Sequence, residues 1–120
     1  IPYTAYFAAR SYMDAHPEVI QGFANAIARA QQWIVEHSDR EVAEAILDQF
    51  PDTDLDTLVA VTARHREIDA WNAAPMMARS ALERLETVMT EAGELTKAQW
   101  VDFYALVDNS FAEKAMESMK

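Results

Sequence analysis

The scarcity of helix-breaking residues is the feature that most constrains this chain. Only two glycines occur in its 120 residues, Gly22 and Gly93, and each of the four prolines stands at a plausible element boundary. Pro17 suits a first helical turn, where its missing N–H would have no partner. After it, apolar residues recur at spacings of three and four, the stripe of an amphipathic helix: Ile20, Phe23, Ile27, Ala30 and Ile34. The sequence therefore predicts a long helix from Pro17 to about His37.

Start and stop signals predict the next helices. Ser38 and Glu41 form the Ser-x-x-Glu pattern of a capping box. The run Thr53-Asp54-Leu55-Asp56 begins a third helix by similar logic, with Asp56 as an acidic residue in its first turn. A fourth helix is expected after Pro75, with Gly93 as the left-handed residue that ends it. The segment 69–75 between these helices breaks the pattern and is predicted to be a loop.

Two more helices are expected near the end of the chain. Thr96 and Gln99 form a second capping box, which predicts a helix that includes Trp100. Ser110 can cap a final short helix that runs to about Met119. Trp33 and Trp100 both lie on apolar stripes, so we interpret them as buried packing residues. The fold class predicted from these patterns is mainly α, with five to six helices over residues 17–119.

The first ten residues follow a different pattern. Residues alternate along 1–10, the segment is rich in aromatic side chains, and both of its faces are apolar enough for a strand buried in a sheet. A helix over 4–13 is the alternative, because Ala, Arg and Met favour helix. We prefer one N-terminal strand over residues 1–10. A single strand needs a partner for its backbone groups, and no second strand is predicted, which indicates that the chain is a fragment.

Composition excludes several classes of function. Twenty acidic and ten basic residues give a formal net charge of -10, which opposes binding to nucleic acid because phosphate backbones are negative. The absence of cysteine excludes disulfides, thiol catalysis and Cys-type metal sites within these residues. No apolar run approaches the ~20 residues that span a bilayer. We expect no nucleic-acid partner.

Candidate chemical groups are few. His65 and Asp69 are four residues apart and could share a helix face, but two ligands do not make a metal site. No nucleophile motif, phosphate loop or HExxH pattern occurs. We therefore predict no catalytic residues, no metal and no cofactor. Trp71 lies in the predicted loop, where it could either stack on a ligand or dock onto the helices.

Several short motifs, taken in order, carry a resemblance to a known family. They are Ile1-Pro2-Tyr3-Thr4, Ser11-Tyr12-Met13, His16-Pro17-Glu18-Val19, Ala26 to Ile34, Phe50-Pro51, and the closing run Val107-Asp108-Asn109-Ser110-Phe111-Ala112-Glu113. Together they resemble the C-terminal part of the nitrate/sulfonate/taurine-type substrate-binding proteins of ABC importers, a family that also includes binders of thiamine-pyrimidine precursors. The resemblance covers essentially the whole chain.

The resemblance implies a fold and a place within it. The complete protein would have a two-lobed α/β fold of the periplasmic binding-protein type, and residues 1–120 would be the C-terminal segment of lobe one. Residues 1–10 would form the strand after the hinge return, and helices over 17–119 would cover that lobe. The missing N-terminal part of the same protein would be a partner of this segment.

The resemblance also implies a function. The complete protein would capture a small solute (a sulfonate, nitrate, taurine or a pyrimidine-like compound) and deliver it to an ABC permease at the membrane. It would be periplasmic or extracellular, held at the membrane through the permease or a lipid anchor. Tyr3 and Thr4, near the hinge, are the first candidates for ligand contact, because a phenol and a hydroxyl can donate hydrogen bonds to an oxyanion. Trp71 is the third candidate.

Two alternatives belong to other classes. The chain could be a free-standing helical domain for protein interaction or dimerisation, which needs no sheet partner. It could also belong to a pyrimidine-forming enzyme on the same fold, which would use iron and consume its own histidine. The absence of cysteine counts against the enzyme. The sequence preceding Ile1 would discriminate among the three hypotheses.

Overall fold

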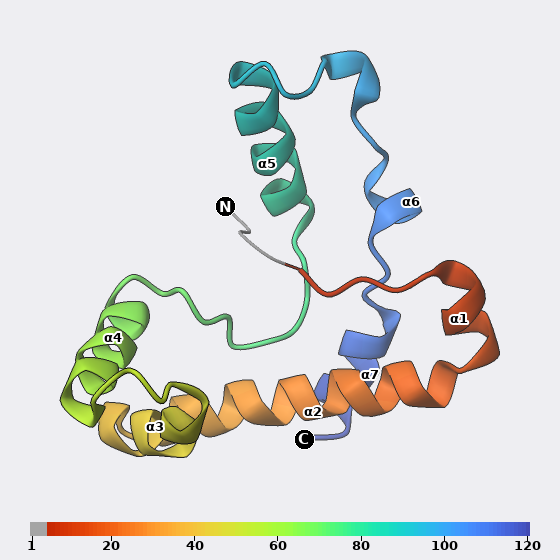
Figure 1. Ribbon diagram of the computed structural model, residues 1–120. Helices are drawn as coiled ribbons and strands as arrows, with labels where there is room; N and C mark the ends of the chain where they lie inside the picture. The colour runs from red at the N-terminus through yellow and green to blue at the C-terminus, as the bar shows by residue number, and fades with distance from the viewer. Residues whose placement is uncertain (1–4) are drawn as a thin grey trace.

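The computed structural model describes residues 5–120 of the chain (Figure 1). Within that range the chain forms seven α-helices and two short 3-10 turns. The α-helices are α1 (Arg10–Ala15), α2 (Pro17–Glu36), α3 (Asp39–Ile46), α4 (Leu55–Glu67), α5 (Arg79–Glu91), α6 (Phe103–Leu106) and α7 (Ser110–Glu117), and the 3-10 turns are η1 (Leu47–Gln49) and η2 (Lys97–Gln99). None of these helices combines the length and the apolar character needed to cross a membrane.

The prediction of an N-terminal strand and an α/β fold is wrong for the described residues. Residues 5–9 run extended and exposed without regular structure, and α1 begins at Arg10. No strand or sheet occurs anywhere in 5–120, and the first four residues of the predicted strand lie outside the described part. The physical reason is that a strand needs a neighbouring strand for its backbone groups, and every other segment with regular structure is helical.

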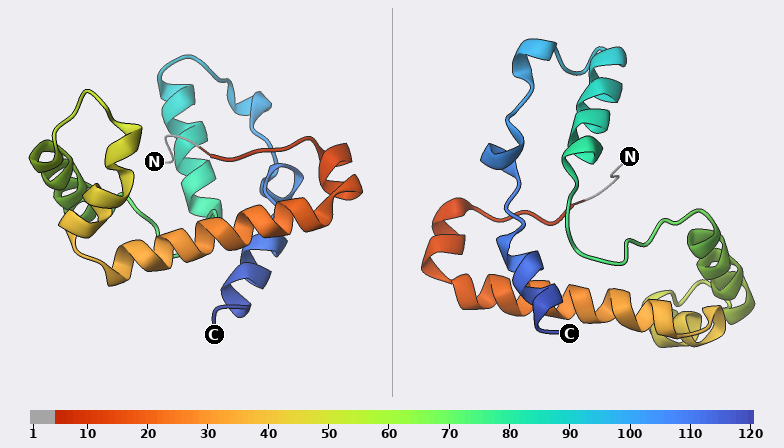
Figure 2. Two further views of the ribbon diagram at one scale, coloured as in Figure 1. Left: turned by 60° about the horizontal axis from the view of Figure 1, so that its bottom comes forward. Right: turned by 180° about the vertical axis from the view of Figure 1, so that it is seen from behind.

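The long helix α2 organises the molecule. It begins at Pro17 and ends at Glu36, as the sequence predicts. Figures 1 and 2 show α7 crossing α2, the pair α3 and α4 at its C-terminal end, and α5 rising away from it. The crossing is held by the Gln21 side-chain amide, which donates to the Phe111 carbonyl oxygen at 2.9 Å. Ala112 and Ala115 are buried on α7, and such small side chains let two helices approach closely.

A small apolar core joins α3 to α4. Val42 and Ala43 on α3 and Leu58 on α4 are buried, together with Thr62. The predicted capping box is confirmed, because the Glu41 backbone N–H donates to Ser38 Oγ and the Ser38 backbone N–H donates to the Glu41 carboxylate. At the start of α4 the Asp54 carboxylate accepts from the Thr57 backbone N–H at 2.9 Å, so local capping fixes where both helices begin.

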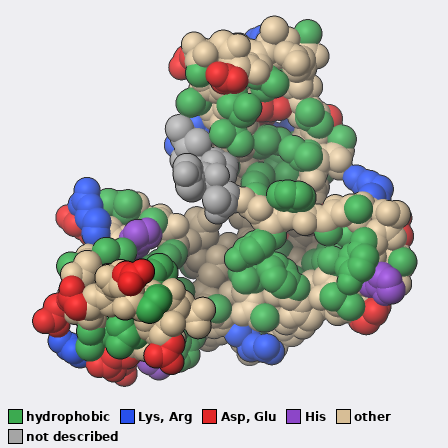
Figure 3. Space-filling model, viewed as in Figure 1, with side chains coloured by type: hydrophobic (Ala, Val, Ile, Leu, Met, Phe, Trp, Pro, Cys, Tyr) green, Lys and Arg blue, Asp and Glu red, His purple; other side chains and the backbone are tan. Residues whose placement is uncertain are grey.

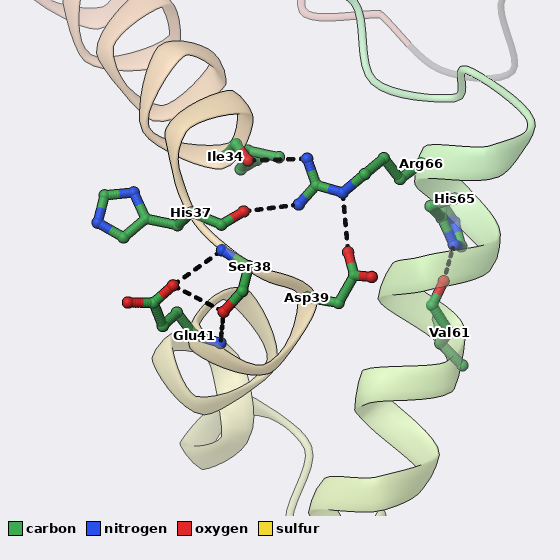
Figure 4. A network of polar contacts seen from close by, with 8 residues as sticks. All are labelled: Ile34, His37, Ser38, Asp39, Glu41, Val61, His65 and Arg66. Atoms are coloured by element: carbon green, nitrogen blue, oxygen red, sulfur yellow. Dashed lines mark hydrogen bonds and ion pairs between the residues drawn. The ribbon is translucent and has the colours of Figure 1, made fainter.

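Arg66 ties α4 to the end of α2 (Figure 4). Its Nε donates to Asp39 Oδ1 at 2.8 Å. Its two terminal nitrogens donate to the carbonyl oxygens of Ile34 at 3.0 Å and His37 at 2.9 Å. The last carbonyls of a helix have no partner within the helix, so one guanidinium both caps α2 and pairs with the first residue of α3.

The helix predicted from Thr96 is wrong in its extent. The Thr96–Gln99 capping box is present, but the turn that it starts is only η2, and the chain is extended again before the short α6. Trp100 Nε1 donates to Thr90 Oγ1 at 2.9 Å, and the Val101 backbone N–H donates to the buried Glu86 carboxylate at 2.8 Å. In a continuous helix the Val101 backbone N–H would donate within the helix and would not reach Glu86. The bonds to α5 therefore require the chain to leave the helical conformation here.

The predicted burial of Trp33 is also wrong. The side chain is 37% exposed, and its ring stacks on His37 with centroids 4.0 Å apart and planes at 22°. His37 Nδ1 lies 2.7 Å from the Trp33 carbonyl oxygen, which closes the last turn of α2. Trp33 therefore packs against His37 at the end of its own helix and stays partly exposed.

The shape is open rather than globular. The radius of gyration is 16.9 Å, whereas a compact domain of this length has a radius of about 13.6 Å. Apolar side chains gather on the visible surface around the extended segment and around α5 (Figure 3). The large exposed apolar residues include Tyr6, Phe7, Tyr104 and Leu106.

Candidate functional site

A surface cavity of about 530 Å³ lies where α1, the turn before α5, α6 and the start of α7 meet. These segments are far apart in the sequence and are brought together by the fold. The lining residues are Arg10, Met77, Arg79, Phe103, Tyr104, Val107, Asp108, Asn109, Ser110 and Glu113. The volume lies within the range of small-molecule sites, about 300 to 1,000 Å³, so this cavity is the candidate site.

Asn109 fixes one wall of the cavity. Its side-chain oxygen accepts from the Met77 backbone N–H at 3.1 Å, and its side-chain nitrogen donates to the Met77 carbonyl oxygen at 2.9 Å. The two bonds span 32 positions of sequence and are partly buried. The short Asn side chain carries both a carbonyl acceptor and an NH₂ donor. Asn109 is therefore well suited to hold the segment before α5 against the start of α7.

Two arginines supply positive charge to the cavity. The Arg79 guanidinium carbon lies 5.2 Å from the centroid of the Phe103 ring and 5.0 Å from that of Tyr104. Within residues 5–120 no carboxylate pairs with Arg79, and no hydrogen bond from its guanidinium is found. The Arg10 guanidinium donates to the Ala105 carbonyl oxygen at 3.2 Å, which leaves donors of both side chains available.

Two carboxylates stand at the same cavity. Asp108 Oδ1 accepts from the Ser110 backbone N–H at 2.9 Å. Hydrogen bonds from the side chain and then the backbone of Ser110 lower the pKa of Asp108, and the charges of Arg10 and Lys114 add to this effect. Glu113 is the other carboxylate. The cavity thus carries both signs of charge beside an aromatic wall.

The arrangement is suited to binding a small anionic group. Arginine is the side chain best suited to hold a planar or tetrahedral oxyanion, because its fork of donors matches such groups. Phe103 and Tyr104 offer apolar contact beside it. No group of three potential metal-ligating side chains converges within the described chain. The chemistry on offer is recognition of a small organic anion or a zwitterion.

Of the three residues predicted from the sequence as ligand contacts, only Trp71 lies among the described residues, and it does not line this cavity. Tyr3 and Thr4 lie outside the described residues, so their role stays a prediction. Trp71 lies in the loop between α4 and α5, as expected, and its ring stacks on His65 with centroids 5.5 Å apart. His65 Nδ1 in turn lies 2.9 Å from the Val61 carbonyl oxygen. A ligand-stacking role for Trp71 also stays a prediction.

Sequence reasoning missed the residues that form the cavity. Arg10 and Arg79 are isolated cations in the sequence, with no motif around them. In the sequence Asn109 is only part of the Asp-Asn-Ser-Phe run that carries the family resemblance. That run does not predict the contact between Asn109 and Met77, which is seen only in the fold. The missing signal is long-range contact, which no local pattern contains.

Comparisons with known proteins give one clear similarity. No family model matches the chain, and no solved structure matches it. The chain is 33% identical over 114 residues to a Bacillus subtilis (strain 168) protein named "Putative binding protein YtlA". The match covers 95% of this chain and 34% of that protein, so the chain spans about a third of the length of the curated relative. The residues described above are therefore similar to one segment of a longer protein that is named a binding protein.

Proposed function

We propose that this chain is a segment of a solute-binding protein that captures a small solute and delivers it to an ABC permease. The observation that carries the proposal is the identity of 33% over 95% of the chain with a protein named a binding protein. That relative is about three times as long as the match, which supports a role for these residues as part of a larger polypeptide. The complete protein would act outside the cytoplasm, at the permease.

The cavity supports a specific contribution by this segment. Arg79 has no partner for its guanidinium within the described residues and stands beside two aromatic rings. Such a group holds a sulfonate, nitrate or carboxylate well, because the hydrogen bonds are charge-assisted. We therefore propose a solute with an anionic end, as in a sulfonate, nitrate or taurine, whose charged group meets Arg79. A pyrimidine-like solute would instead use the aromatic wall.

Titration of the complete gene product tests this proposal. The product that contains this sequence should be titrated calorimetrically with taurine, nitrate, an alkanesulfonate and an aminopyrimidine. At least one should bind with micromolar affinity or better, about −8 kcal/mol. Arg79→Ala should weaken an anionic solute at least about tenfold, by loss of a charge-assisted bond. Arg84→Ala is the matched control, because Arg84 is an exposed arginine on the same helix away from the cavity. Absence of binding by all four solutes would refute the proposal.

A helical interaction domain is the second candidate. The open shape and the all-helical content of residues 5–120 favour it. It predicts that the 120-residue chain forms a stable dimer in light scattering and that the complete gene product binds none of the four solutes. The formal net charge of -10 opposes such self-association, because two copies repel each other.

A further inference from the structure

The chain exposes far more surface than a compact protein of its mass. Its accessible surface is 8842 Å², whereas a folded monomer of this mass exposes about 6,550 Å². The surplus is about 2,300 Å². One partner contributes about 800 Å² to a protein interface of standard size, and about 1,000 to 2,500 Å² to an obligate one. The surplus therefore matches one side of a large permanent interface.

Part of this surplus is a set of large exposed apolar side chains on two segments, which we call the aromatic face. It comprises Tyr6 and Phe7 on the extended segment, with Tyr104 and Leu106 on α6. Phe7 is 98% exposed, Tyr6 77%, Tyr104 75% and Leu106 61%. The bond from Arg10 to the Ala105 carbonyl oxygen holds the start of α1, which follows the extended segment directly, against α6.

Few residues of the described chain pack against the aromatic face. Tyr6 meets the Phe23 ring edge-on with centroids 4.8 Å apart, but Phe23 is itself 47% exposed. Exposed apolar patches rimmed by polar groups mark interaction sites. The occupant of this face therefore presents an apolar surface of its own.

We infer that the aromatic face is the surface on which the remaining part of the same polypeptide packs. The relative described above is about three times as long as the matched segment. By analogy, a complete protein of that length would have further residues that can cover this face. A second copy of the chain is the competing occupant, but each copy carries a net charge of -10, and like-charged surfaces repel. The covalent link to the rest of the polypeptide favours the intramolecular contact, because it raises the effective concentration of the two surfaces.

This inference rests on the proposed function only in assuming a longer polypeptide. Its test uses no solute, so failure to find a ligand would leave it untouched. The 120 residues contain no cysteine, which permits single reactive thiols to be placed by substitution. Phe7→Cys and Leu106→Cys report on the aromatic face. Glu67→Cys is the control, on α4, where the side chain is 69% exposed.

Each variant should be made both in the 120-residue chain and in the complete gene product. Alkylation of the thiol is then followed by mass spectrometry of the peptide that contains it, with circular dichroism to check the helices. In the 120-residue chain all three variants should react at the rate of an exposed thiol. In the complete product the Phe7 and Leu106 variants should react at least about tenfold more slowly, as burial protects groups from solvent, while the Glu67 variant keeps its rate.

Protection in the complete product that is independent of protein concentration would support the inference. Equal rates in the two proteins would overturn it, because the face would then be exposed in both. Protection in the 120-residue chain that grows with concentration would also overturn it, since a second copy would then be the occupant. Protection of the complete product that is lost on dilution would overturn it in the same way.

Discussion

Removal of Arg66 should test whether one side chain holds the α2–α3–α4 junction together. Its guanidinium donates to Asp39 Oδ1 at 2.8 Å and to the carbonyl oxygens of Ile34 and His37 at 3.0 and 2.9 Å. Hydrogen bonds with one charged partner contribute about 1.5–3 kcal/mol each when shielded from water. The Arg66 and Asp39 side chains are 37% and 31% exposed, so solvent screening reduces this sum. We expect Arg66→Ala to lower the free energy of unfolding by about 2 kcal/mol.

Urea denaturation followed by circular dichroism measures this loss. With a slope of about 1.5 kcal/mol/M, the midpoint should fall by about 1.3 M urea. Arg66→Lys should recover less than half of the loss, because one ammonium group cannot span three acceptors on different elements. Arg64→Ala is the control: Arg64 makes an exposed pair with Glu67 three residues away, and its removal should cost under about 0.5 kcal/mol.

Two results would refute this reasoning. If Arg66→Ala and Arg64→Ala have the same midpoint, the bonds to the end of α2 contribute no more than an exposed ion pair. If Arg66→Lys has the same urea midpoint as the unsubstituted chain, then the positive charge alone stabilises the junction and the geometry of the three hydrogen bonds does not matter. Either result would mean that the small apolar core of α3 and α4 holds the junction without the guanidinium.

Three further predictions concern local features. Asn109→Ala should lower the free energy of unfolding by about 1–3 kcal/mol, measured in urea, because it leaves a partly buried backbone N–H and carbonyl unpaired; no loss would show that water replaces the bridge. Ser38→Ala should cost about 1 kcal/mol at pH 7 by loss of the cap. The Ser38 side chain, and then its backbone, lower the pKa of Glu41, so the part of the cap that the Glu41 carboxylate contributes is present above the ordinary carboxyl pKa and is lost as the pH falls through the lowered value. A cost of Ser38→Ala that is the same at neutral pH and in acid below that lowered pKa would contradict the assignment. Gly22→Ala should stabilise the chain by about 0.8–1 kcal/mol, since Gly22 is inside α2 with open space around it. Gly93→Ala should destabilise it by about 1 kcal/mol or more because of its φ of +79°, and thermal melts that move both variants in the same direction would contradict the pair.

The sequence predicts the local features of this fold well. The start of α2 at Pro17, the capping box at Ser38, the start of α4 within the run Thr53-Asp54-Leu55-Asp56 and the positive φ of Gly93 are all confirmed. Each is decided by residues within one helical turn, so a short pattern contains all the necessary information. The final helix is confirmed, but the predicted cap by Ser110 is wrong, because Ser110 is the first residue inside α7 and Asn109 occupies the N-cap position without a side-chain cap bond.

The errors all involve contacts between distant parts of the chain. An amphipathic stripe predicts that Trp33 is buried but cannot say how completely other elements cover it, and the side chain is 37% exposed. The helix expected from Thr96 is interrupted because Trp100 and Val101 bond to α5. The candidate cavity depends on bringing Arg10 to α6 and α7, across almost the whole chain. No local pattern encodes that distance.

The open shape also has a consequence for the heat capacity of unfolding. An unfolded chain of this mass exposes about 19,700 Å², so folding of these residues removes about a sixth less surface from water than folding of a compact monomer would. The heat-capacity change scales with that area, and it should therefore lie below the usual value of about 12–15 cal/mol/K per residue. Enthalpy and entropy of unfolding would then vary less with temperature. The isolated chain should have a flattened stability curve and a broad melting transition.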